Sequence, residues 1–551
     1  MARPAEAFGL QENAFARHMR RDRAISLAAG ILALAALGAG IRWGAMVAGG
    51  ADSYGYISQA GYWQRGSVVV QEDVIRSSPW PGAPLTWAPI GYRPSPTRPD
   101  AIVPLYAPGL PLLMALGQLI AGFCGAFLVV PLCGALTIWL TYVLGRRVFG
   151  APGIALWGAG LVATSPVFLY QLMNAMSDVP VTAAWTLALV LTLSRRPLTA
   201  GFAMSAAIAI RPNLAPLGSV LIAWTALSEA RQGGVSGAAS ASVRVAAGVA
   251  ISVIGIAVFN ARVYESPLTS GYGTTSDLYA LRFFSANARQ FASWIADVET
   301  PVVVLAALFF IAPGLLPPAT IPFARLLLGG SLLVALLSYL FYQPFDVWWY
   351  LRFLLPAWPV MMLLTAAALE TIARRWLRPI YPFAIAAAVA LFAWHGVRVA
   401  VDRSVFDLGR SERRYIDVAR FIAGHTDPDA VILSVQHSGS LRLYADRLTL
   451  RYDALDPLWL DRVVTHLQSI GRRPYYVLDG GEVEAFRRRF GAANRAGTLD
   501  WPPLATLRGT IAVYDPIDRR PDASPLAIAG TRGAHGLCDA PQSWPPVLRM
   551  K

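Results

Sequence analysis

Long apolar runs separated by short polar segments recur along this chain from about residue 24 to residue 400. A helix of about 20 apolar residues is long enough to cross the hydrocarbon core of a bilayer. The pattern therefore predicts a polytopic α-helical membrane protein with about 11 spans. We place these spans at 24–46, 123–144, 152–170, 179–194, 198–210, 213–229, 243–261, 299–316, 323–342, 352–370 and 380–400.

Arginine clusters between the apolar runs orient the predicted spans. The segment RHMRRDR precedes the first run, and arginine pairs follow the runs that end near residues 144 and 194. Lysine and arginine collect in cytoplasmic loops, so the N-terminal segment 1–23 is expected in the cytoplasm. The first run has no cleavage pattern and is interpreted as an uncleaved transmembrane helix. An odd number of spans places the C-terminal part outside.

Two segments interrupt the apolar pattern of the predicted membrane domain, residues 24–400. The first is an extracytoplasmic loop, 47–121, rich in Pro, Trp and Tyr, whose Pro-broken apolar end, 104–121, is interpreted as juxtamembrane or re-entrant. The second is the break RPN, 211–213, where Pro212 disfavours helix at the residue before it. Both breaks lie on the predicted outer side.

Residues 401–551 follow a different pattern and predict a small extracytoplasmic α/β domain. The segments with helical periodicity are 415–425 and 459–471, and the short strand-like runs are 430–435, 474–479 and 509–515. No glycine-rich phosphate loop follows any of these strands, which argues against a Rossmann cofactor site.

Composition supports the membrane assignment and excludes several function classes. The chain has 551 residues, of which 55% are hydrophobic and 15% charged, whereas soluble domains carry roughly 25% charged residues. The net charge of +14 comes without a basic stripe or a known nucleic-acid motif, so no nucleic-acid partner is expected. The three cysteines do not indicate a disulfide framework, and the six histidines lack metal-site spacing. His437 is interpreted as a surface or hydrogen-bonded loop residue.

Polar residues gather at the outer ends of the predicted spans. Asp52 opens a segment in which Tyr56, Gln59 and Trp63 share its helical face. The other polar residues at this level are Asn174, Asp178, Arg211, Asp346, Tyr350 and Arg352. We expect two acids and two arginines of this set to converge on one outward-facing cavity.

Carboxylates and arginines at a membrane surface suit a transferase that uses a lipid-phosphate donor. An aspartate can accept the proton of an attacking hydroxyl or amine. Arginine can stabilise the charge that develops on a departing phosphate. Aromatic side chains at the headgroup level can stack on sugars.

These residues resemble the motifs of the GT-C glycosyltransferases, in particular the branch of protein O-mannosyltransferases and aminoarabinose transferases. The first-loop motif Asp-Glu-x-x-Tyr is similar to DSYGY, which has Asp52 and Tyr56 but carries Ser53 in place of the glutamate. The second acidic motif, D-x-P, is similar to Asp178 followed by Pro180. Ser53 departs from the pattern where two adjacent carboxylates would stand.

Two basic positions extend the resemblance to about residues 20–400. Arg211 matches a basic residue that faces the donor phosphate, and Arg352 lies in LRFLLP, which is similar to a late R-[FY]-L-L-P segment. The resemblance implies a single inverting displacement with Asp52 as general base, Asp178 as a second catalytic residue, and both arginines on the donor phosphate. The residues expected to line the substrate site are Tyr56, Gln59, Asn174 and Tyr350.

The resemblance also implies partners and a location. The donor would be a polyprenyl-phosphate sugar, and the acceptor an extracytoplasmic lipid, glycan or protein. The protein would lie in a bacterial inner membrane, and a divalent metal ion is left open.

Simpler roles remain open for each residue. Asp52 and Asp178 stand where an acid caps a helix, and Arg211 and Arg352 stand where an arginine anchors to headgroups. Two other functions also remain open, a transporter or flippase of lipid-linked glycans and a non-catalytic membrane scaffold with a partner-binding outer domain.

Overall fold

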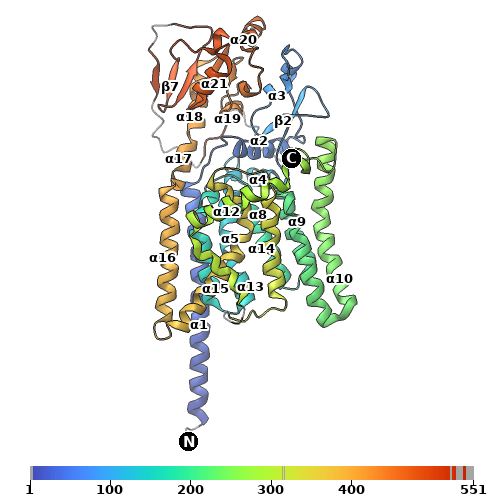
Figure 1. Ribbon diagram of the computed structural model, residues 1–551, viewed down its shortest axis with the longest axis vertical. Helices are drawn as coiled ribbons and strands as arrows, with labels where there is room; N and C mark the ends of the chain where they lie inside the picture. The colour runs from blue at the N-terminus through green and yellow to red at the C-terminus, as the bar shows by residue number, and fades with distance from the viewer. Residues whose placement is uncertain (1–3, 313, 315–316, 521–523, 529–537, 542–551) are drawn as a thin grey trace.

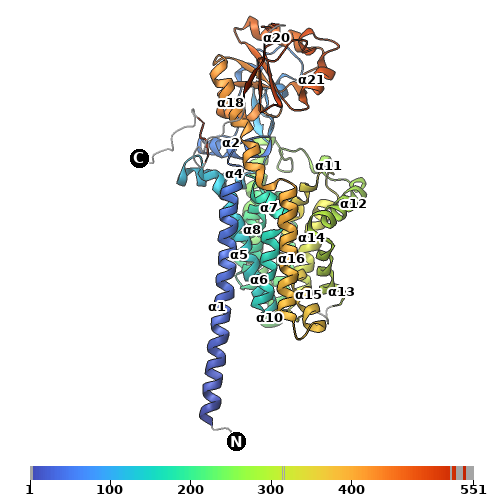
Figure 2. The same cartoon turned by 90° about the vertical axis from the view of Figure 1, so that its left-hand side faces the viewer.

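A bundle of long helices carries a mixed α/β unit at one end (Figure 1). This computed structural model describes residues 4–312, 314, 317–520, 524–528 and 538–541. Helix α1 (Pro4–Trp43) runs along the bundle, and its N-terminal part extends beyond the other helices at the end opposite the α/β unit (Figure 2).

The described residues include 5 helices long and apolar enough to cross a membrane, or up to 7 if each bent pair counts as one span. The long segments are Met19–Trp43, Gly125–Phe149 (α5), Pro212–Tyr264, Trp348–Trp376 and Tyr381–Asp402 (α16). Four apolar helices are shorter: α4 (Gly109–Ala121), α8 (Asp178–Leu193), α9 (Pro197–Ile210) and α14 (Ala324–Leu340). The fold is that of a polytopic helical membrane protein, while the predicted number of spans stays a prediction.

The predicted cytoplasmic loop between 229 and 243 is helical. Helix α10 (Leu217–Tyr264) continues through it and departs from helical geometry at Gly234, where φ is 64°. Gly234 lacks a Cβ atom and adopts this left-handed conformation without steric cost. The two halves of α10 lie side by side, because a Cβ atom on Gly218 would contact Val249 at 3.7 Å.

Two other predicted spans are broken rather than continuous. The run 152–170 folds as α6 (Pro152–Thr164) and α7 (Pro166–Leu172), which meet at 62°. In the run 299–316, a 113° bend is followed by a 3₁₀ helix, η5 (Pro301–Ala307), and one α-helical turn, α13 (Leu308–Ile311). In both cases a proline begins the second helix, as expected for a residue favoured in the first turn.

The loop 47–121 has its own secondary structure. It contains α2 (Asp52–Gln64), the short helix α3 (Ala83–Trp87), α4, and an antiparallel sheet in the order β1 (Val70–Gln71), β3 (Ala101–Pro104), β2 (Tyr92–Pro94). Helix α4 has 13 residues, which gives about 20 Å at 1.5 Å per residue and is too short to cross the bilayer core.

The C-terminal part is a small α/β unit, as the sequence predicts. Its sheet has the order β5 (Leu448–Leu450), β4 (Val431–Leu433), β6 (Pro474–Asp479), β8 (Ile511–Tyr514), β7 (Ala505–Leu507), β9 (Leu526–Ile528). The first three strands are parallel, and β6, β8 and β7 are antiparallel. The main helices are α18 (Arg414–His425), α19 (Ser438–Tyr444), α20 (Leu460–Ser469) and α21 (Glu482–Phe490).

The α/β unit is fixed to the loop 47–121 by polar contacts and close packing. Arg442 pairs with Glu72 and donates to the carbonyl of Trp87 at 2.6 Å. Helix α19 also lies against α2, since a Cβ atom on Gly439 would come within 2.2 Å of the Tyr54 ring. The segment that begins at Asp52 is therefore held from the side of the α/β unit.

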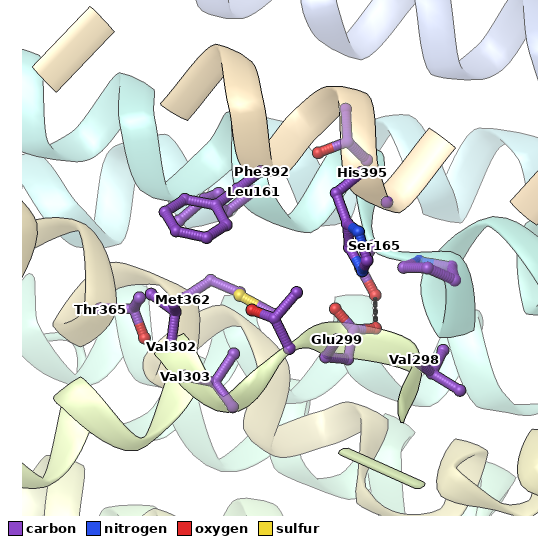
Figure 3. A pocket seen from close by; sticks show the side chains of 14 residues that line it. Leu161, Ser165, Val298, Glu299, Val302, Val303, Met362, Thr365, Phe392 and His395 are labelled. Atoms are coloured by element: carbon purple, nitrogen blue, oxygen red, sulfur yellow. Dashed lines mark hydrogen bonds between the residues drawn. The ribbon is translucent and has the colours of Figure 1, made fainter. Parts of the chain in front are cut away.

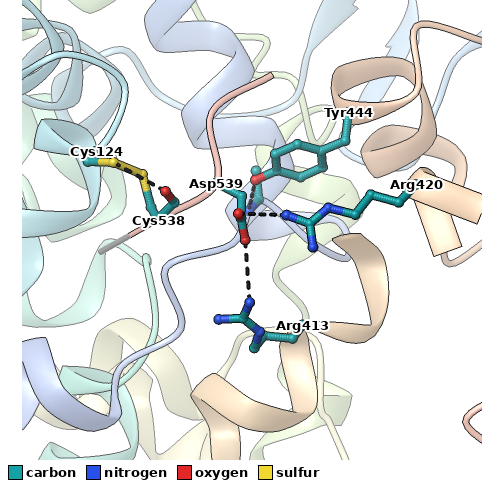
Figure 4. The surroundings of a disulfide bond; sticks show 7 residues. Cys124, Arg413, Arg420, Tyr444, Cys538 and Asp539 are labelled. Atoms are coloured by element: carbon teal, nitrogen blue, oxygen red, sulfur yellow. Dashed lines mark hydrogen bonds and ion pairs between the residues drawn. A yellow bond between two sulfur atoms is a disulfide. The ribbon is translucent and has the colours of Figure 1, made fainter. Parts of the chain in front are cut away.

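A disulfide joins Cys124, before α5, to Cys538 near the C-terminus, at a sequence separation of 414 positions (Figure 4). The next residue, Asp539, forms ion pairs with Arg420 at 2.7 Å and Arg413 at 3.6 Å. The expectation of no disulfide is therefore wrong. No local spacing could reveal a pair so far apart in the chain.

Loss of this disulfide is expected to destabilise the protein. In Cys124→Ser the constraint on the unfolded chain is lost, and the free energy of unfolding should fall by about 2–4 kcal/mol. Thermal unfolding in detergent measures the change, and thiol alkylation before and after reduction counts the paired cysteines. Cys133→Ser is the control, because Cys133 is a free thiol. Three reactive thiols in the unreduced protein would contradict the pairing.

Candidate functional site

A cavity of about 560 Å³ lies where α2, the break before α10 and the segment after α14 meet. Six of the eight predicted site residues line it, namely Asp52, Tyr56, Asp178, Arg211, Tyr350 and Arg352. Their roles stay predictions, but the expected convergence is present in the structure.

Asp52 is the first residue of α2, and Ala51 occupies the N-cap position before it. Its Oδ1 accepts a hydrogen bond from the Tyr106 hydroxyl at 2.9 Å. Its Oδ2 accepts from both terminal nitrogens of Arg352 at 3.2 Å. Ser53 is directed elsewhere, because its hydroxyl donates to the Val47 carbonyl at 2.9 Å. The Asp52 carboxylate is therefore held toward the cavity and not toward the helix end.

Asp178 begins α8 and pairs with Arg211. The Arg211 guanidinium donates to Asp178 Oδ1 at 2.5 Å and to the Ser177 hydroxyl at 3.0 Å. The Asp178 side chain is 1% exposed and that of Arg211 is 11% exposed. Arg352 lies 4.0 Å from the other oxygen of Asp178. One chain of charges thus runs Asp52–Arg352–Asp178–Arg211.

Local backbone structure explains where the two arginines point. Arg211 has φ −144° and ψ 90°, an extended conformation between α9 and a short 3₁₀ turn. Pro212 favours that conformation for the residue before it. Arg352 lies in the 3₁₀ helix η7 (Trp348–Ala357). Arg211 thus leaves an extended residue between two helices, and Arg352 leaves a stretch of 3₁₀ helix that continues directly into α-helix at Trp358.

Aromatic side chains form much of the cavity wall. They are Tyr56, Tyr106, Phe259, Tyr264, Tyr272, Tyr279, Tyr339, Tyr342, Phe345, Tyr350 and Phe353. The Arg352 guanidinium lies 5.0 Å from the Tyr350 ring centre, a cation–π contact. Burial and the nearby Asp52 carboxylate raise the pKa of Tyr56 and of Tyr106, so both hydroxyls stay protonated.

Two predicted residues do not line the cavity. Gln59 is buried and donates to the Tyr106 carbonyl at 3.4 Å. Asn174 donates to the Tyr170 carbonyl at 2.8 Å within its own turn. Gln59 supports the backbone that carries Tyr106, while Asn174 closes the end of α7.

A buried acid supports the bent helix pair that leads to Asp178. Glu299 accepts a hydrogen bond from the Ser165 hydroxyl (Figure 3). The same oxygen also accepts from the Val167 backbone N–H and the Trp358 indole. Ser165 also caps α7 by accepting from Phe168 N. The acid thereby fixes the start of α7, whose end leads into 174–178.

Several lining residues escape prediction from sequence. Tyr106 follows β3 in a loop whose fold is not evident from periodicity, and its ring lies against Gly55, where a Cβ atom would come within 2.0 Å. Tyr339 is buried in α14 and accepts from Arg211 at 3.5 Å. Tyr272 belongs to the segment YESPLTSGYG, residues 264–273. The polar composition of this segment is the sequence feature that could have pointed to Tyr272 as a lining residue.

Of the two predicted positions for His437, surface or hydrogen-bonded loop, the structure excludes the surface. Its side chain is fully buried, and its Nε2 lies 3.5 Å from Asp479 Oδ2 on the neighbouring strand β6. Burial lowers the pKa of His437. The sheet brings these two residues together across 42 positions of sequence, which spacing alone does not reveal.

The structure gives no separate support to a metal site. Among the described residues, no group of three or more His, Cys, Asp or Glu side chains could hold a metal ion.

Comparisons with solved structures identify the fold. ArnT from Cupriavidus metallidurans bound to undecaprenyl phosphate matches with a TM-score of 0.58 and 13% identity, over 89% of this chain and 97% of that one. Its apo state matches with a TM-score of 0.53 and 14% identity, over 91% and 98%. The Archaeoglobus fulgidus oligosaccharyltransferase tethered to an acceptor peptide matches with a TM-score of 0.52 and 12% identity, over 90% and 74%.

These neighbours are GT-C glycosyltransferases, so the predicted resemblance in fold is confirmed. No model of a known protein family matches the sequence. No curated protein matches it either.

Removal of the Asp178 charge is expected to destabilise the protein. In Asp178→Asn the Arg211 guanidinium loses its closest carboxylate while remaining buried, which should cost about 3 kcal/mol. Thermal unfolding in detergent checks this. Asp346→Asn is the control, because Asp346 is exposed and its loss should change stability by less than about 0.5 kcal/mol. Equal melting temperatures for the two variants would show that the pair does not stabilise the fold.

Proposed function

We propose that this protein is a membrane glycosyltransferase that transfers a sugar from a polyprenyl-phosphate donor to an extracytoplasmic acceptor. The observation that carries the proposal is the chain of charges in the cavity, Asp52–Arg352–Asp178–Arg211. The GT-C fold and the undecaprenyl phosphate and acceptor peptide bound by two neighbours support it.

Arg352 is suited to hold the donor phosphate. Its Nε is buried and has no hydrogen-bond partner among the described residues, although a buried N–H normally has one. A phosphate oxygen would satisfy this donor. Arg211 would supply a second positive charge at the same wall of the cavity.

Asp52 is suited to act as general base. Its two oxygens accept from Tyr106 and Arg352, and these contacts fix the carboxylate at the cavity wall. In the proposed step the acceptor loses its proton to Asp52 and its oxygen or nitrogen attacks the anomeric carbon. The bond from that carbon to the phosphate oxygen breaks, and polyprenyl phosphate leaves with the electron pair. Asp178 would orient both arginines through its contacts with each.

The cavity also fits a donor whose tail remains in lipid. Part of its wall is apolar and includes Ile256 and Phe259 of α10. On other faces of the same stretch, Ile251, Ile254 and Val258 are exposed, as expected for side chains that contact lipid. The headgroup would then enter the polar end while the polyprenyl chain stays beside α10.

The disulfide supports the proposed orientation. Disulfides persist in oxidising compartments such as the periplasm. Cys124 of the pair Cys124–Cys538 follows α4, which lies beside α2 at the end of the bundle that carries the α/β unit (Figure 2). We therefore place the cavity and the C-terminal domain outside a bacterial inner membrane, with residues 1–23 in the cytoplasm. The domain boundaries 24–400 and 401–551 belong to this proposal.

Asp52→Asn should abolish most of the transfer. Loss of a general base costs about 10²–10⁴-fold in rate. The assay supplies purified protein with radiolabelled polyprenyl-phosphate sugars and a membrane extract, and follows released polyprenyl phosphate and labelled acceptor. Asp346→Asn is the matched control and should retain the wild-type rate.

The same assay separates the other two functions. A flippase would move the lipid-linked glycan across vesicles without cleaving it, and a scaffold would leave the donor intact. Transfer at the wild-type rate by Asp52→Asn, or an intact donor with every sugar supplied, would overturn the proposal.

A further inference from the structure

We propose that the donor carries a neutral sugar, without an amino or a carboxyl group; this inference rests on the proposed function. Among the described residues that line the cavity, Asp52 and Asp178 are the only acids, and Arg211 and Arg352 are the only bases. Each acid is paired with a base of the same set. The charges of the wall therefore balance one another, and neither acid is free to pair with a charged group on the sugar.

The two carboxylates have little capacity for an ammonium group. The Asp178 side chain is 1% exposed and already faces both arginines. Asp52 is the more accessible of the two, at 27% exposed, but both of its oxygens accept hydrogen bonds. An ammonium beside Asp52 would also stabilise the ionised carboxylate and weaken it as a base.

Three other acids stand beside lining residues in the sequence, Glu265, Asp277 and Asp346, and none of them belongs to the lining. Asp277 lies in the loop that carries Tyr272, but it is outside the lining and accepts from the backbone and hydroxyl of Thr274. Asp346 precedes Tyr350 by four residues, but it is exposed and also outside the lining.

The rest of the polar wall consists of uncharged donors and acceptors. Asn213 donates to the Tyr279 hydroxyl at 3.2 Å, and the hydroxyls of Ser270 and Thr275 belong to the same wall. Such groups pair with sugar hydroxyls, and tyrosine rings stack on the C–H face of a pyranose. A carboxylated sugar would instead compete with the donor phosphate for the two arginines.

Buried unpaired charge is costly, so this wall discriminates against charged sugars. The test supplies wild-type protein with undecaprenyl phosphate linked to glucose, mannose, glucosamine or glucuronic acid, and measures undecaprenyl phosphate released in the presence of membrane extract. We expect release from at least one of the two neutral donors at a rate about tenfold or more above either charged donor.

A variant pair tests the electrostatic basis. Tyr272 lines the cavity, is 48% exposed and contacts the Tyr106 ring at 6.0 Å between centroids. Tyr272→Glu adds an unpaired carboxylate, while Tyr272→Gln has nearly the same shape without charge. The ratio of glucosamine to neutral-donor turnover should rise about tenfold in Tyr272→Glu relative to Tyr272→Gln.

The outcomes separate this inference from the proposed function. Equal or faster release from a charged donor by the wild type overturns the neutral-sugar inference and leaves the glycosyltransferase proposal standing. An unchanged donor ratio between the two variants overturns its electrostatic basis. Release from none of the four donors overturns both.

Discussion

The bridge that Arg352 makes between Asp52 and Asp178 is the contact on which the site depends. These acids lie 126 residues apart in sequence, on α2 and α8. Without a cation between them, two carboxylates at one cavity wall would repel each other and raise the cost of burial. The arginine thus allows a buried acid and a partly exposed acid to stand together, while its buried Nε has no hydrogen-bond partner among the described residues.

The bundle is broken at the places where this bridge is assembled. Arg211 follows α9 at an extended residue before Pro212, and Arg352 lies in a 3₁₀ helix before α15 (Trp358–Trp376). A continuous helix would direct each guanidinium along its own face, into lipid or into a neighbouring helix. Irregular backbone at membrane depth is tolerated where it is buried in protein or lines a cavity. These departures from α-helical geometry therefore form part of the site.

The charged residues of the site could be predicted from sequence because ionisable side chains are rare beside apolar runs of membrane-spanning length. Asp52, Asp178, Arg211 and Arg352 all stand beside apolar runs, and their order follows a known motif set. Tyr106 gives no such signal, since a tyrosine in a Pro- and Trp-rich outer loop is ordinary. The 414-residue separation of Cys124 and Cys538 hides their pairing. The number of spans stays a prediction for a physical reason, because apolar runs do not reveal where a proline or Gly234 bends them.

The C-terminal α/β unit limits the freedom of Asp52 from the side away from the bundle. Tyr415 packs on Gly49, where a Cβ atom would come within 2.1 Å of the ring, and Gly439 packs on Tyr54. Both contacts flank Asp52 within three residues, while Arg352 and Tyr106 hold its carboxylate from the cavity side. A general base must stay within hydrogen-bond reach of the proton that it abstracts. The proposed base is therefore positioned from two sides, by Arg352 and Tyr106 in the cavity and by the packing of the α/β unit on Gly49 and Tyr54.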